Sequence, residues 1–519
     1  MNELDARFSE ALNRLPDYLG QHVIVSVTAL ALGLAISLPL AVLATRSARL
    51  RWPLLAFASI VQTIPGLALL ALFYPLLLGL SALTEMVFGA GFSALGFLPS
   101  VLALTLYSML PVLRNTITGI EGIDPAVRAA SLGVGMTPRQ SLWMVELPLA
   151  LPVIMAGIRT AAVWVIGTAT LSTPVGQTSL GNYIFAGLQT QNWVSVLFGC
   201  FAAAILALVV DQLLALMESG VAARRRSRVA LGGIGLALVL VAALVPGWSR
   251  PPATYAVGAK TFTEQYILAS LIQDRLRANG MSAARRDGLG STVIFNALAS
   301  GEIDVYVDYS GTIWANHMRR TDIKPRDDVL KELGNWLRME RGIEMLGSLG
   351  FENAYALAMR RDRAEELGIK TIADLAARSP QLAIGGDYEF FDRPEWAALR
   401  DAYGLKFRQQ RQMDSTFMYG AVANGDVDVI SAFSSDGRIA RFDLLVLDDP
   451  KQALPPYDAV LLLAPNRAKD DALRKALAPL IGKIDVDRMR EANFRADRDR
   501  DKETPAQAAL WLWEKISGR

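Results

Sequence analysis

Six long apolar runs in the first half of the chain constrain its fold more than any other feature. Each is close to the roughly 20 residues that a helix needs to cross the hydrocarbon core of a bilayer. The runs are 23–44, 53–80, 94–113, 152–171, 194–216 and 229–246. We therefore expect an all-α domain of about six transmembrane helices over 23–246, in contact with the lipid bilayer, after a short N-terminal segment at 1–22.

The first and fourth runs have features that bear on this expectation. The first follows four acidic residues and lacks a small-residue cleavage site, so we expect it to be a retained anchor and not a signal peptide. The fourth contains Arg159, whose charge must reach the interface or face protein because lipid cannot solvate it. Both runs still count as spans.

Arginines are distributed unevenly over the connections between the runs. They cluster after the first, third and fifth runs, as at Arg46, Arg139 and 224–228, whereas 81–93 and 172–193 contain no Lys or Arg. Because positively charged connections stay in the cytoplasm, the exits of the odd-numbered spans are expected there. The N-terminus and everything after Pro246 are then expected on the outer face.

The second half of the chain has a different pattern. The whole chain is 52% hydrophobic but also 20% charged, so a membrane domain and a soluble domain must be combined. After a short linker at 247–253, polar and apolar residues alternate in blocks that are typical of α/β domains. We expect such a domain over 254–519.

An internal repeat divides this soluble domain. The segment Ala297–Val305 recurs as Ala421–Val429, with matching Ala, Gly, acidic and Val positions, and an aromatic follows each shared Val by four residues. These aromatics are Tyr309 and Phe433. The repeat predicts two similar α/β lobes, one at about 254–357 with 462–519 and the other at about 358–461, with a cleft between them.

The two aromatics fall where ligands bind in open α/β sheets. Such sheets bind ligands beyond the carboxyl ends of their strands, where the following helices offer free N–H groups. Each aromatic is followed by small and hydroxyl residues, at 310–312 and 434–437. Each lobe is therefore expected to contribute one aromatic side chain and one polar turn to the cleft.

Several motifs resemble a known family. In the soluble half the segments Gly258–Leu268, Tyr306–Thr312, Phe390–Pro394 and Ser431–Ile439 are similar to the glycine betaine, carnitine and choline binding proteins of bacterial osmoprotectant ABC importers. In the membrane half the segments Glu121–Gly133, Glu146–Pro148 and Leu151–Gly157 resemble the cytoplasmic coupling loop of permeases of the same family. The first resemblance spans nearly the whole soluble half, and the second roughly the first five runs.

The resemblance implies a fold and a site. It implies a permease followed by a two-lobed domain of the periplasmic-binding-protein type, in which aromatic side chains surround a trimethylammonium group through cation–π attraction. The matching aromatic positions are Tyr309, Tyr355, Phe391, Tyr419 and Tyr457, with Phe433 added by the repeat. Candidates for the polar end of the ligand are Thr263, Gln265, Thr312 and Arg393. For Tyr355, Phe391, Tyr419 and Tyr457, packing in the core is an equal alternative.

The resemblance also implies a contact with a cytoplasmic ABC ATPase through a coupling loop at 121–157. The matching positions are Glu121, Asp124, Arg128, Ala129, Gly133, Glu146 and Pro148, and the alternative is a plain solvated connection. Two segments depart from the family pattern. Ala129-Ala130-Ser131 stands where Glu-Ala-Ala is usual, which removes a carboxylate, and 306–312 differs from the common Tyr-Pro-Glu-Tyr-Thr-Gly-Thr, which bears on ligand preference.

Other functions find little support in the sequence. It has no Gly-x-x-x-x-Gly-Lys-Ser/Thr motif, so ATP is expected on a partner chain and this chain is expected to be a transport subunit without a cofactor, not an enzyme. Cys200 with His22 and His317 cannot assemble a zinc site, and a net charge of +2 gives no support for nucleic-acid binding.

We expect a homodimer in the bacterial cytoplasmic membrane with the C-terminal domain in the periplasm. The runner-up is a ligand-gated receptor or channel with a two-lobed outer domain. The coupling loop argues against this alternative, because a channel needs no docking site for an ATPase. The sequence does not choose among glycine betaine, choline, carnitine and a larger betaine such as ergothioneine.

Overall fold

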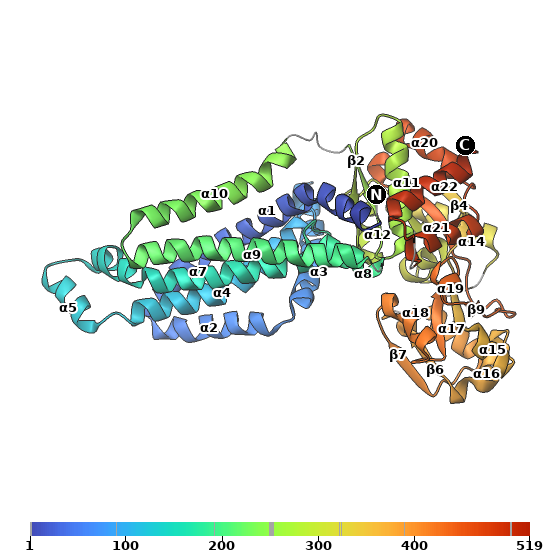
Figure 1. Ribbon diagram of the computed structural model, residues 1–519, viewed down its shortest axis with the longest axis horizontal. Helices are drawn as coiled ribbons and strands as arrows, with labels where there is room; N and C mark the ends of the chain where they lie inside the picture. Colours follow the sequence, from blue (N-terminus) through green and yellow to red (C-terminus); the bar gives the residue numbers. More distant parts are fainter. Residues whose placement is uncertain are drawn as a thin grey trace. The chain divides into compact units, whose positions relative to one another are not determined.

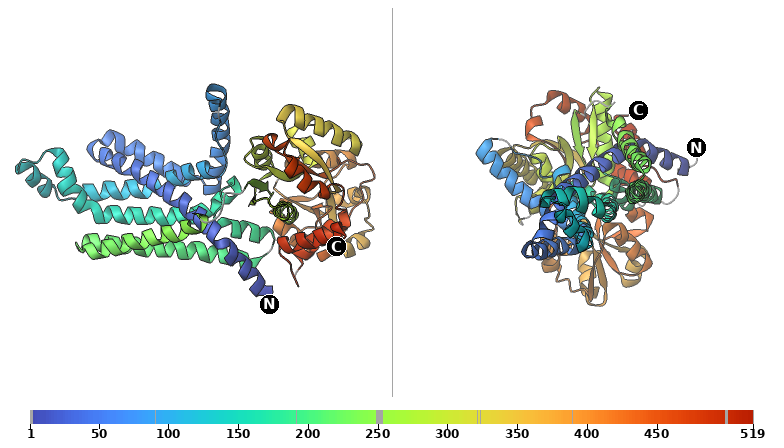
Figure 2. Two further views of the ribbon diagram at one scale, coloured as in Figure 1. Left: turned by 90° about the horizontal axis from the view of Figure 1, so that it is seen from above. Right: turned by 90° about the vertical axis from the view of Figure 1, so that its left-hand side faces the viewer.

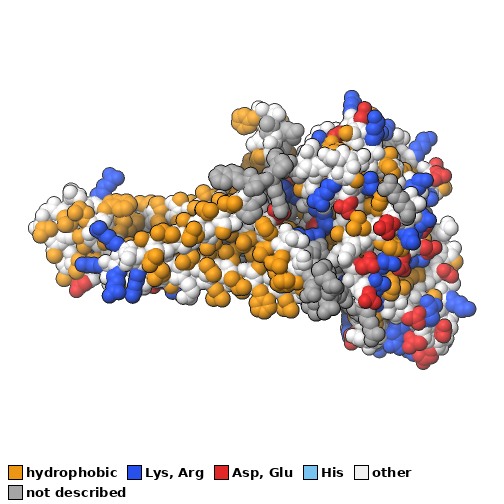
Figure 3. All heavy atoms as spheres, turned by 45° about the horizontal axis from the view of Figure 1, so that its top comes forward, with side chains coloured by type: hydrophobic (Ala, Val, Ile, Leu, Met, Phe, Trp, Pro, Cys, Tyr) orange, Lys and Arg blue, Asp and Glu red, His pale blue; other side chains and the backbone are white. Residues whose placement is uncertain are grey.

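A computed structural model describes residues 3–89, 91–190, 192–248, 254–320, 322, 324–388, 390–498 and 501–518. Two compact parts are present, a helical part within 8–251 and an α/β part that contains 254–518 (Figure 1). Their surfaces differ in composition. Hydrophobic side chains cover most of the visible surface of the helical part, whereas Lys, Arg, Asp and Glu are spread over the α/β part (Figure 3).

Six helices of the described residues are long and apolar enough to cross a membrane, which confirms the expected number of spans. Their apolar side chains suit contact with lipid tails. A helix also pairs its own backbone N–H and C=O groups, as the hydrocarbon core of a bilayer requires. They are α1 (Glu3–Arg46), α3 (Gly66–Phe88), α4 (Phe97–Glu121), α7 (Leu147–Ala169), α9 (Trp193–Ala222) and α10 (Arg226–Trp248).

The second apolar run differs from its prediction as a single span at 53–80. It forms two helices, α2 (Ala48–Thr63) and α3, separated at Ile64 and Pro65. Proline disfavours the helical conformation in the preceding residue, and Ile64 is extended with φ −73° and ψ 127°. The Tyr107 hydroxyl donates a hydrogen bond to the carbonyl that this break leaves free on Ile64. The span that follows the break lies at 66–88.

Close packing and one ion-pair network join the helices of this part. α4 and α7 approach closely at Gly157, where a Cβ would lie 2.6 Å from the Cβ of Asn115. Arg159 of α7 is partly exposed and faces carboxylates of α9. Its Nη2 lies 2.9 Å from Oδ2 of Asp211 and its Nη1 lies 3.5 Å from Glu218. The fourth span therefore carries its arginine against a neighbouring helix.

A helical hairpin forms the segment between α4 and α7. It consists of α5 (Pro125–Gly133), α6 (Pro138–Ser141) and the π-helical turn η1 (Leu142–Glu146). Each short helix begins with a polar cap and a proline, the arrangement that satisfies free N–H groups at a helix start. Asp124 accepts from the N–H of Ala126 at 2.8 Å, and Thr137 forms a reciprocal capping box with Gln140.

Two five-stranded sheets form the α/β part, and their strands have the same spatial order and directions. Helices surround the strands of this part (Figure 2). In each sheet, three neighbouring strands are parallel and the fourth runs antiparallel to both of its neighbours. The first has the order β2 (Ala283–Arg286), β1 (Tyr255–Gly258), β3 (Val305–Tyr309), β10 (Asp458–Leu463), β4 (Glu344–Glu352). The second has the order β7 (Gln409–Gln412), β6 (Ala383–Gly386), β8 (Val429–Phe433), β5 (Tyr355–Arg360), β9 (Leu444–Val446).

The matching topologies confirm the two lobes that the internal repeat predicts. The repeated segments end in β3 and β8, which occupy the central position of their sheets. The remaining helices are α8 (Gly181–Gln189), α11 (Thr263–Ala278), α12 (Ser291–Ala299), α13 (Ser310–Thr312), α14 (Arg326–Arg341), α15 (Arg361–Leu367), α16 (Ile372–Arg378), α17 (Pro394–Tyr403), α18 (Ser415–Asn424), α19 (Arg438–Arg441), α20 (Asp471–Leu477), α21 (Val486–Asp497) and α22 (Pro505–Ser517). The short turns are η2 (Thr170–Val175), η3 (Ile313–His317), η4 (Ser379–Gln381), η5 (Phe390–Asp392), η6 (Pro465–Arg467) and η7 (Ala478–Leu480).

The chain crosses between the sheets twice. The crossings lie at 353–354 and 447–457, whereas the expected boundaries at 357 and 461 fall inside strands. The difference arises from strand pairing, because all of β5 belongs to the second sheet and all of β10 to the first. Of the expected linker at 247–253, Gly247 and Trp248 belong to α10 and the rest lies outside the described residues.

Candidate functional site

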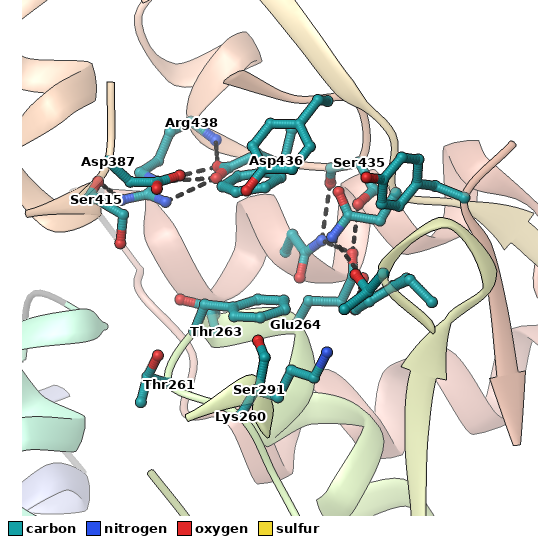
Figure 4. A pocket seen from close by; sticks show the side chains of 18 of the residues that line it. Lys260, Thr261, Thr263, Glu264, Ser291, Asp387, Ser415, Ser435, Asp436 and Arg438 are labelled. Atoms are coloured by element: carbon teal, nitrogen blue, oxygen red, sulfur yellow. Dashed lines mark hydrogen bonds and ion pairs between the residues drawn. The ribbon is translucent and has the colours of Figure 1, made fainter. Parts of the chain in front are cut away.

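A cavity of about 220 Å³ lies between the two sheets (Figure 4). Its lining begins where four parallel strands end, after β1, β3, β6 and β8, which is the position predicted from the general geometry of α/β sheets. The lining residues are Lys260, Thr261, Phe262, Thr263, Glu264, Ser291, Tyr309, Thr312, Asn353, Tyr355, Asp387, Tyr388, Arg393, Asp414, Ser415, Phe433, Ser435, Asp436, Arg438, Tyr457, Asn493 and Asp497.

Most of the residues singled out in the sequence meet in this lining. They are Tyr309, Tyr355, Phe433, Tyr457, Thr263, Thr312 and Arg393. Three others lie behind it. Gln265 is buried and donates from Nε2 to the Tyr309 hydroxyl at 3.1 Å. Phe391 packs edge-on against Trp396 at a centroid distance of 5.4 Å. Tyr419 is fully buried in the core of the second lobe.

Aromatic rings from both lobes form a continuous wall. The ring of Phe262 is parallel to that of Phe433, at 3° and a centroid distance of 6.3 Å, and it stacks on Tyr309 at 6.1 Å. Tyr355 contacts Phe433 at 4.9 Å and meets Tyr457 edge-on at 5.9 Å. Such a wall offers several electron-rich ring faces to a cation.

Two buried cations accompany the rings. Arg393 lies 5.1 Å from the centroid of Tyr355 and its Nη2 lies 3.1 Å from Oε1 of Glu395, which also accepts from the Tyr457 hydroxyl. The ammonium of Lys260 forms an ion pair with Asp308 and lies 5.4 Å from the ring centroid of Tyr309. Each cation therefore has a carboxylate that compensates its burial, as buried charges require.

A third charged pair forms another part of the lining. Arg438 donates to both carboxylate oxygens of Asp436, including from Nε to Oδ1 at 3.0 Å and from Nη2 to Oδ2 at 2.7 Å (Figure 4). The guanidinium lies 4.1 Å from the ring centroid of Tyr419, and the Tyr419 hydroxyl accepts from the N–H of Phe433 at 3.1 Å. Tyr419 thus supports the lining from behind.

Glu264 lies in the floor of the cavity and is wholly buried. Its Oε1 accepts from the Tyr309 hydroxyl at 2.5 Å and from Nδ2 of Asn353 at 3.1 Å. Its Oε2 accepts from the Ser435 hydroxyl at 2.5 Å and from Nδ2 of Asn493 at 2.9 Å. Burial raises the pKa of Glu264, and the hydrogen bonds from Ser435, Tyr309 and Asn493 oppose that rise.

Asp497 is a second buried carboxyl in the lining. It accepts from the Thr263 hydroxyl at 2.9 Å, and burial raises its pKa to about 6, while the charge of Arg438 acts in the opposite direction. Over the described ranges, no group of three or more His, Cys, Asp or Glu is placed to hold a metal ion.

Sequence reasoning missed several lining residues. Some lie in segments that the sequence had already marked as part of the site, although they were not named individually. Those in the motif at 258–268 are Lys260, Phe262 and Glu264, and those in the polar turn after Phe433 are Ser435 and Asp436. A second group had no local signal, because α21 joins the cavity from more than fifty residues beyond β8. Its members are Asn493 and Asp497.

The expected coupling residues divide by exposure. Glu121, Asp124, Ala129, Gly133 and Pro148 are exposed, and Arg128 is partly buried. Glu146 is only 2% exposed. Its Oε1 lies 2.8 Å from Nη2 of Arg46 and its Oε2 lies 3.6 Å from Nε of Arg128, so this carboxylate ties α5 to the end of α1. The apolar surface beside these residues includes exposed Val134, Trp143 and Met144.

Comparison with known proteins identifies both halves. The chain is 29% identical over 465 residues to the ergothioneine transport permease/ergothioneine binding protein EgtU of Helicobacter pylori, covering 86% of this chain and 80% of that protein. It is 40% identical over 199 residues to the glycine betaine/carnitine/choline transport system permease protein OpuCB of Bacillus subtilis, covering 38% of this chain and 84% of that protein. It is 32% identical over 276 residues to a glycine-betaine-binding protein of Pseudomonas aeruginosa, covering 49% and 86%.

Two family models divide the chain between them. Residues 33–223 match the inner membrane component of binding-protein-dependent transport systems. Residues 253–515 match the substrate binding domain of the ABC-type glycine betaine transport system, which is half of the chain. The chain therefore belongs to the betaine-type ABC importers, as a permease fused to its own substrate-binding domain.

Proposed function

We propose that this protein imports a betaine, a quaternary ammonium compound that also carries a carboxylate, and that a separate ATPase subunit powers the import. The observation that carries this proposal is the wall of Phe262, Tyr309, Tyr355, Phe433 and Tyr457 around one cavity. A trimethylammonium group makes no hydrogen bonds and is attracted to each ring face by about 0.5–2 kcal/mol. Rings from both lobes favour closure around such a group.

The polar side of the cavity supports a carboxylate on the ligand. Lys260 and Arg393 are buried cations in the lining, and Thr312 adds a hydroxyl. The names of the relatives agree with this class, since ergothioneine, carnitine and glycine betaine all combine a trimethylammonium group with a carboxylate. Choline, which has a hydroxyl in place of the carboxylate, is expected to bind more weakly.

Import needs the ATPase-contacting hairpin and the α/β part on opposite sides of the membrane. Arginines gather at the end of the helical part that carries α5 (Figure 3), and the positive-inside rule assigns this end to the cytoplasm. The exposed hairpin of α5 and α6 then offers its surface to the ATPase. Two copies form the pathway, and the α/β part captures the ligand in the periplasm.

A ligand panel tests the proposed substrate class. The full chain in lipid nanodiscs is titrated calorimetrically with glycine betaine, carnitine, ergothioneine and choline, and with acetate as the control that lacks the ammonium group. At least one of the betaines is expected to bind, to bind more tightly than choline, and to raise the apparent Tm by mass action. Binding of acetate alone, or of no trimethylammonium compound, would contradict the proposal.

Vesicle transport separates an importer from a ligand-gated channel. Proteoliposomes with the ATPase subunit and ATP are expected to accumulate the ligand found in the panel. Vesicles without ATP are expected to show no flux down a ligand gradient. Flux that depends on ligand but not on ATP would instead support the channel.

A further inference from the structure

We propose that Glu264 supplies the negative charge that makes the cavity prefer a cation, and that it acts through the ring of Tyr309. This inference rests on the proposed function, because it concerns the same ligand. Glu264 lies in the floor, and the Tyr309 hydroxyl stands between its carboxylate and the aromatic wall. Glu264 is thus a positioning residue for the charge of the site.

The hydrogen bonds of Glu264 favour the ionised form. A carboxylate has four lone-pair positions and no proton to donate, and here four donors fill them, two on each oxygen. A protonated carboxyl would direct its own O–H toward one of these donors. The donor set therefore suits an anion and opposes burial, which raises the pKa of Glu264.

The charge of Glu264 is not cancelled by its hydrogen-bond partners. These partners are Tyr309, Asn353, Ser435 and Asn493, all of them uncharged. The cations in the lining have carboxylates of their own, since Lys260 pairs with Asp308, Arg393 with Glu395 and Arg438 with Asp436. Because a buried charge is weakly screened, the potential of Glu264 extends into the cavity.

Tyr309 transmits this charge to the ligand position. A phenol that donates a short hydrogen bond to an anion is polarised, and its ring becomes a better partner for a cation. The 2.5 Å bond from Tyr309 to Glu264 provides that polarisation. The ring of Tyr309 stacks on Phe262, which continues the wall to Phe433.

The same carboxylate also joins the two lobes. Tyr309 belongs to β3 of the first sheet, Ser435 follows β8 of the second, and Asn353 lies at the crossing between them. A loss of Glu264 could therefore loosen the cavity for every ligand. The test must separate this structural contribution from the effect of charge.

Isosteric ligands make that separation. Glycine betaine is compared with 3,3-dimethylbutanoate, and choline with 3,3-dimethylbutan-1-ol, in which carbon replaces the charged nitrogen without a change of shape. In each pair, the Kd of the carbon analogue divided by the Kd of the ammonium ligand measures the preference for the cation. We expect Glu264→Gln to reduce this ratio about tenfold, the scale of a partly screened buried charge, in the full chain in nanodiscs.

Two further variants complete the experiment. Tyr309→Phe keeps the ring and removes the bond to Glu264, so we expect it to reduce the ratio by a smaller factor, and it serves if Glu264→Gln does not fold. Glu344→Gln makes the same substitution at a carboxylate of β4 that pairs with Arg338 and Arg474 outside the lining, and we expect it to keep the wild-type ratio.

The outcomes distinguish the two proposals. If Glu264→Gln weakens both ligands of a pair by the same factor, Glu264 supports the cavity only mechanically and the inference is wrong. An unchanged ratio in Tyr309→Phe shows that the charge does not act through the ring, and overturns that part. A wild-type chain with no preference for the cation in either pair overturns the inference and also counts against the proposed substrate class.

Discussion

Individual side chains in the cavity combine two kinds of interaction. Rings surround the space, and the charged groups Arg393, Arg438 and Lys260 each have a carboxylate partner. Tyr309 takes part in both kinds of interaction, because its ring is part of the aromatic wall and its hydroxyl donates a hydrogen bond to the carboxylate of Glu264. Substitutions at this scale are therefore expected to change affinity and charge preference separately.

Tyr309→Ala is expected to weaken binding of the trimethylammonium ligand at least tenfold. This corresponds to about 1.4 kcal/mol, which is within the range for one lost cation–π contact. Calorimetry on the full chain measures it. Tyr309→Phe, which retains the ring, is expected to bind more tightly than the alanine variant, and equal affinities of the two would contradict a role for the ring.

Asp497→Asn is expected to stabilise the chain at pH 7. The pKa of Asp497 is raised to about 6 in the folded state and is near 4 in the unfolded chain, so ionisation above that range opposes folding. The stabilisation should shrink as the pH falls through 6 and 4, because Asp497 is protonated in both states only well below pH 4. Thermal unfolding followed at several pH values measures it, and a gain in Tm that is independent of pH would contradict this assignment.

Individual residues could be predicted only where a repeat or a motif marked them. Tyr309 and Phe433 were found because the repeat places them after equivalent strands. Tyr419 and Phe391 also match aromatic positions of the family, but they lie behind the lining. A motif does not separate the two locations, because an aromatic side chain packs equally well in the core. Burial depends on neighbours that are distant in sequence.

At the scale of elements, Glu146 explains how a short surface helix is held. α5 makes its connection to the rest of the helical part through Arg128 and Ser131, and the Ser131 hydroxyl lies 2.8 Å from that of Ser141. Glu146 lies behind both and also reaches Arg46 at the end of α1. Glu146 therefore connects α5 to the end of α1 and, through η1, to the start of α7.

Glu146→Gln is expected to lower the free energy of unfolding by about 2 kcal/mol, because it leaves two arginines without their shared carboxylate. ATP-driven uptake in proteoliposomes is expected to fall with it. Glu366→Gln is the matched control, since its pair with Arg363 is 65% exposed at Glu366 and 36% at Arg363, outside both the hairpin and the cavity, and such pairs contribute little. Equal losses in the two variants would show that Glu146 has no special role.

Secondary-structure elements were predicted best where a short stretch of sequence determines them. The six spans follow from apolar length alone. The two capped helices between α4 and α7 were not predicted, although Asp124-Pro125 and Thr137-Pro138 mark where they begin. The break at Pro65 was missed because hydrophobicity continues across it, although the proline itself was a signal. The crossings between lobes were displaced by a few residues, since strand pairing is set by partners that a local pattern does not reveal.

At the scale of the whole molecule, the orientation of the two halves is the property on which import depends. The chain has one cysteine, Cys200, and a variant with Cys200→Ser gives a background for labelling. Met339 of α14 and Val134 beside α5 are 82% and 76% exposed, so each suits a single reporter cysteine.

Met339→Cys is expected to react with a membrane-impermeant maleimide in intact spheroplasts, and Val134→Cys only after permeabilisation. The reason is that the arginine-rich connections are retained in the cytoplasm. Gel-shift labelling in the Cys200→Ser background measures both. Labelling of Val134→Cys in intact spheroplasts would reverse the assignment and exclude import by this scheme.

The strand order has a consequence for biosynthesis. β10 lies between β3 and β4 although it is the last strand to leave the ribosome, so the first sheet remains split until residue 463 has been made. Until then β3 and β4 present unpaired edges, which favour aggregation. A nascent chain arrested before β10 thus has no complete first lobe, and its two strand edges stay open to pairing with other chains until residue 463 has been made.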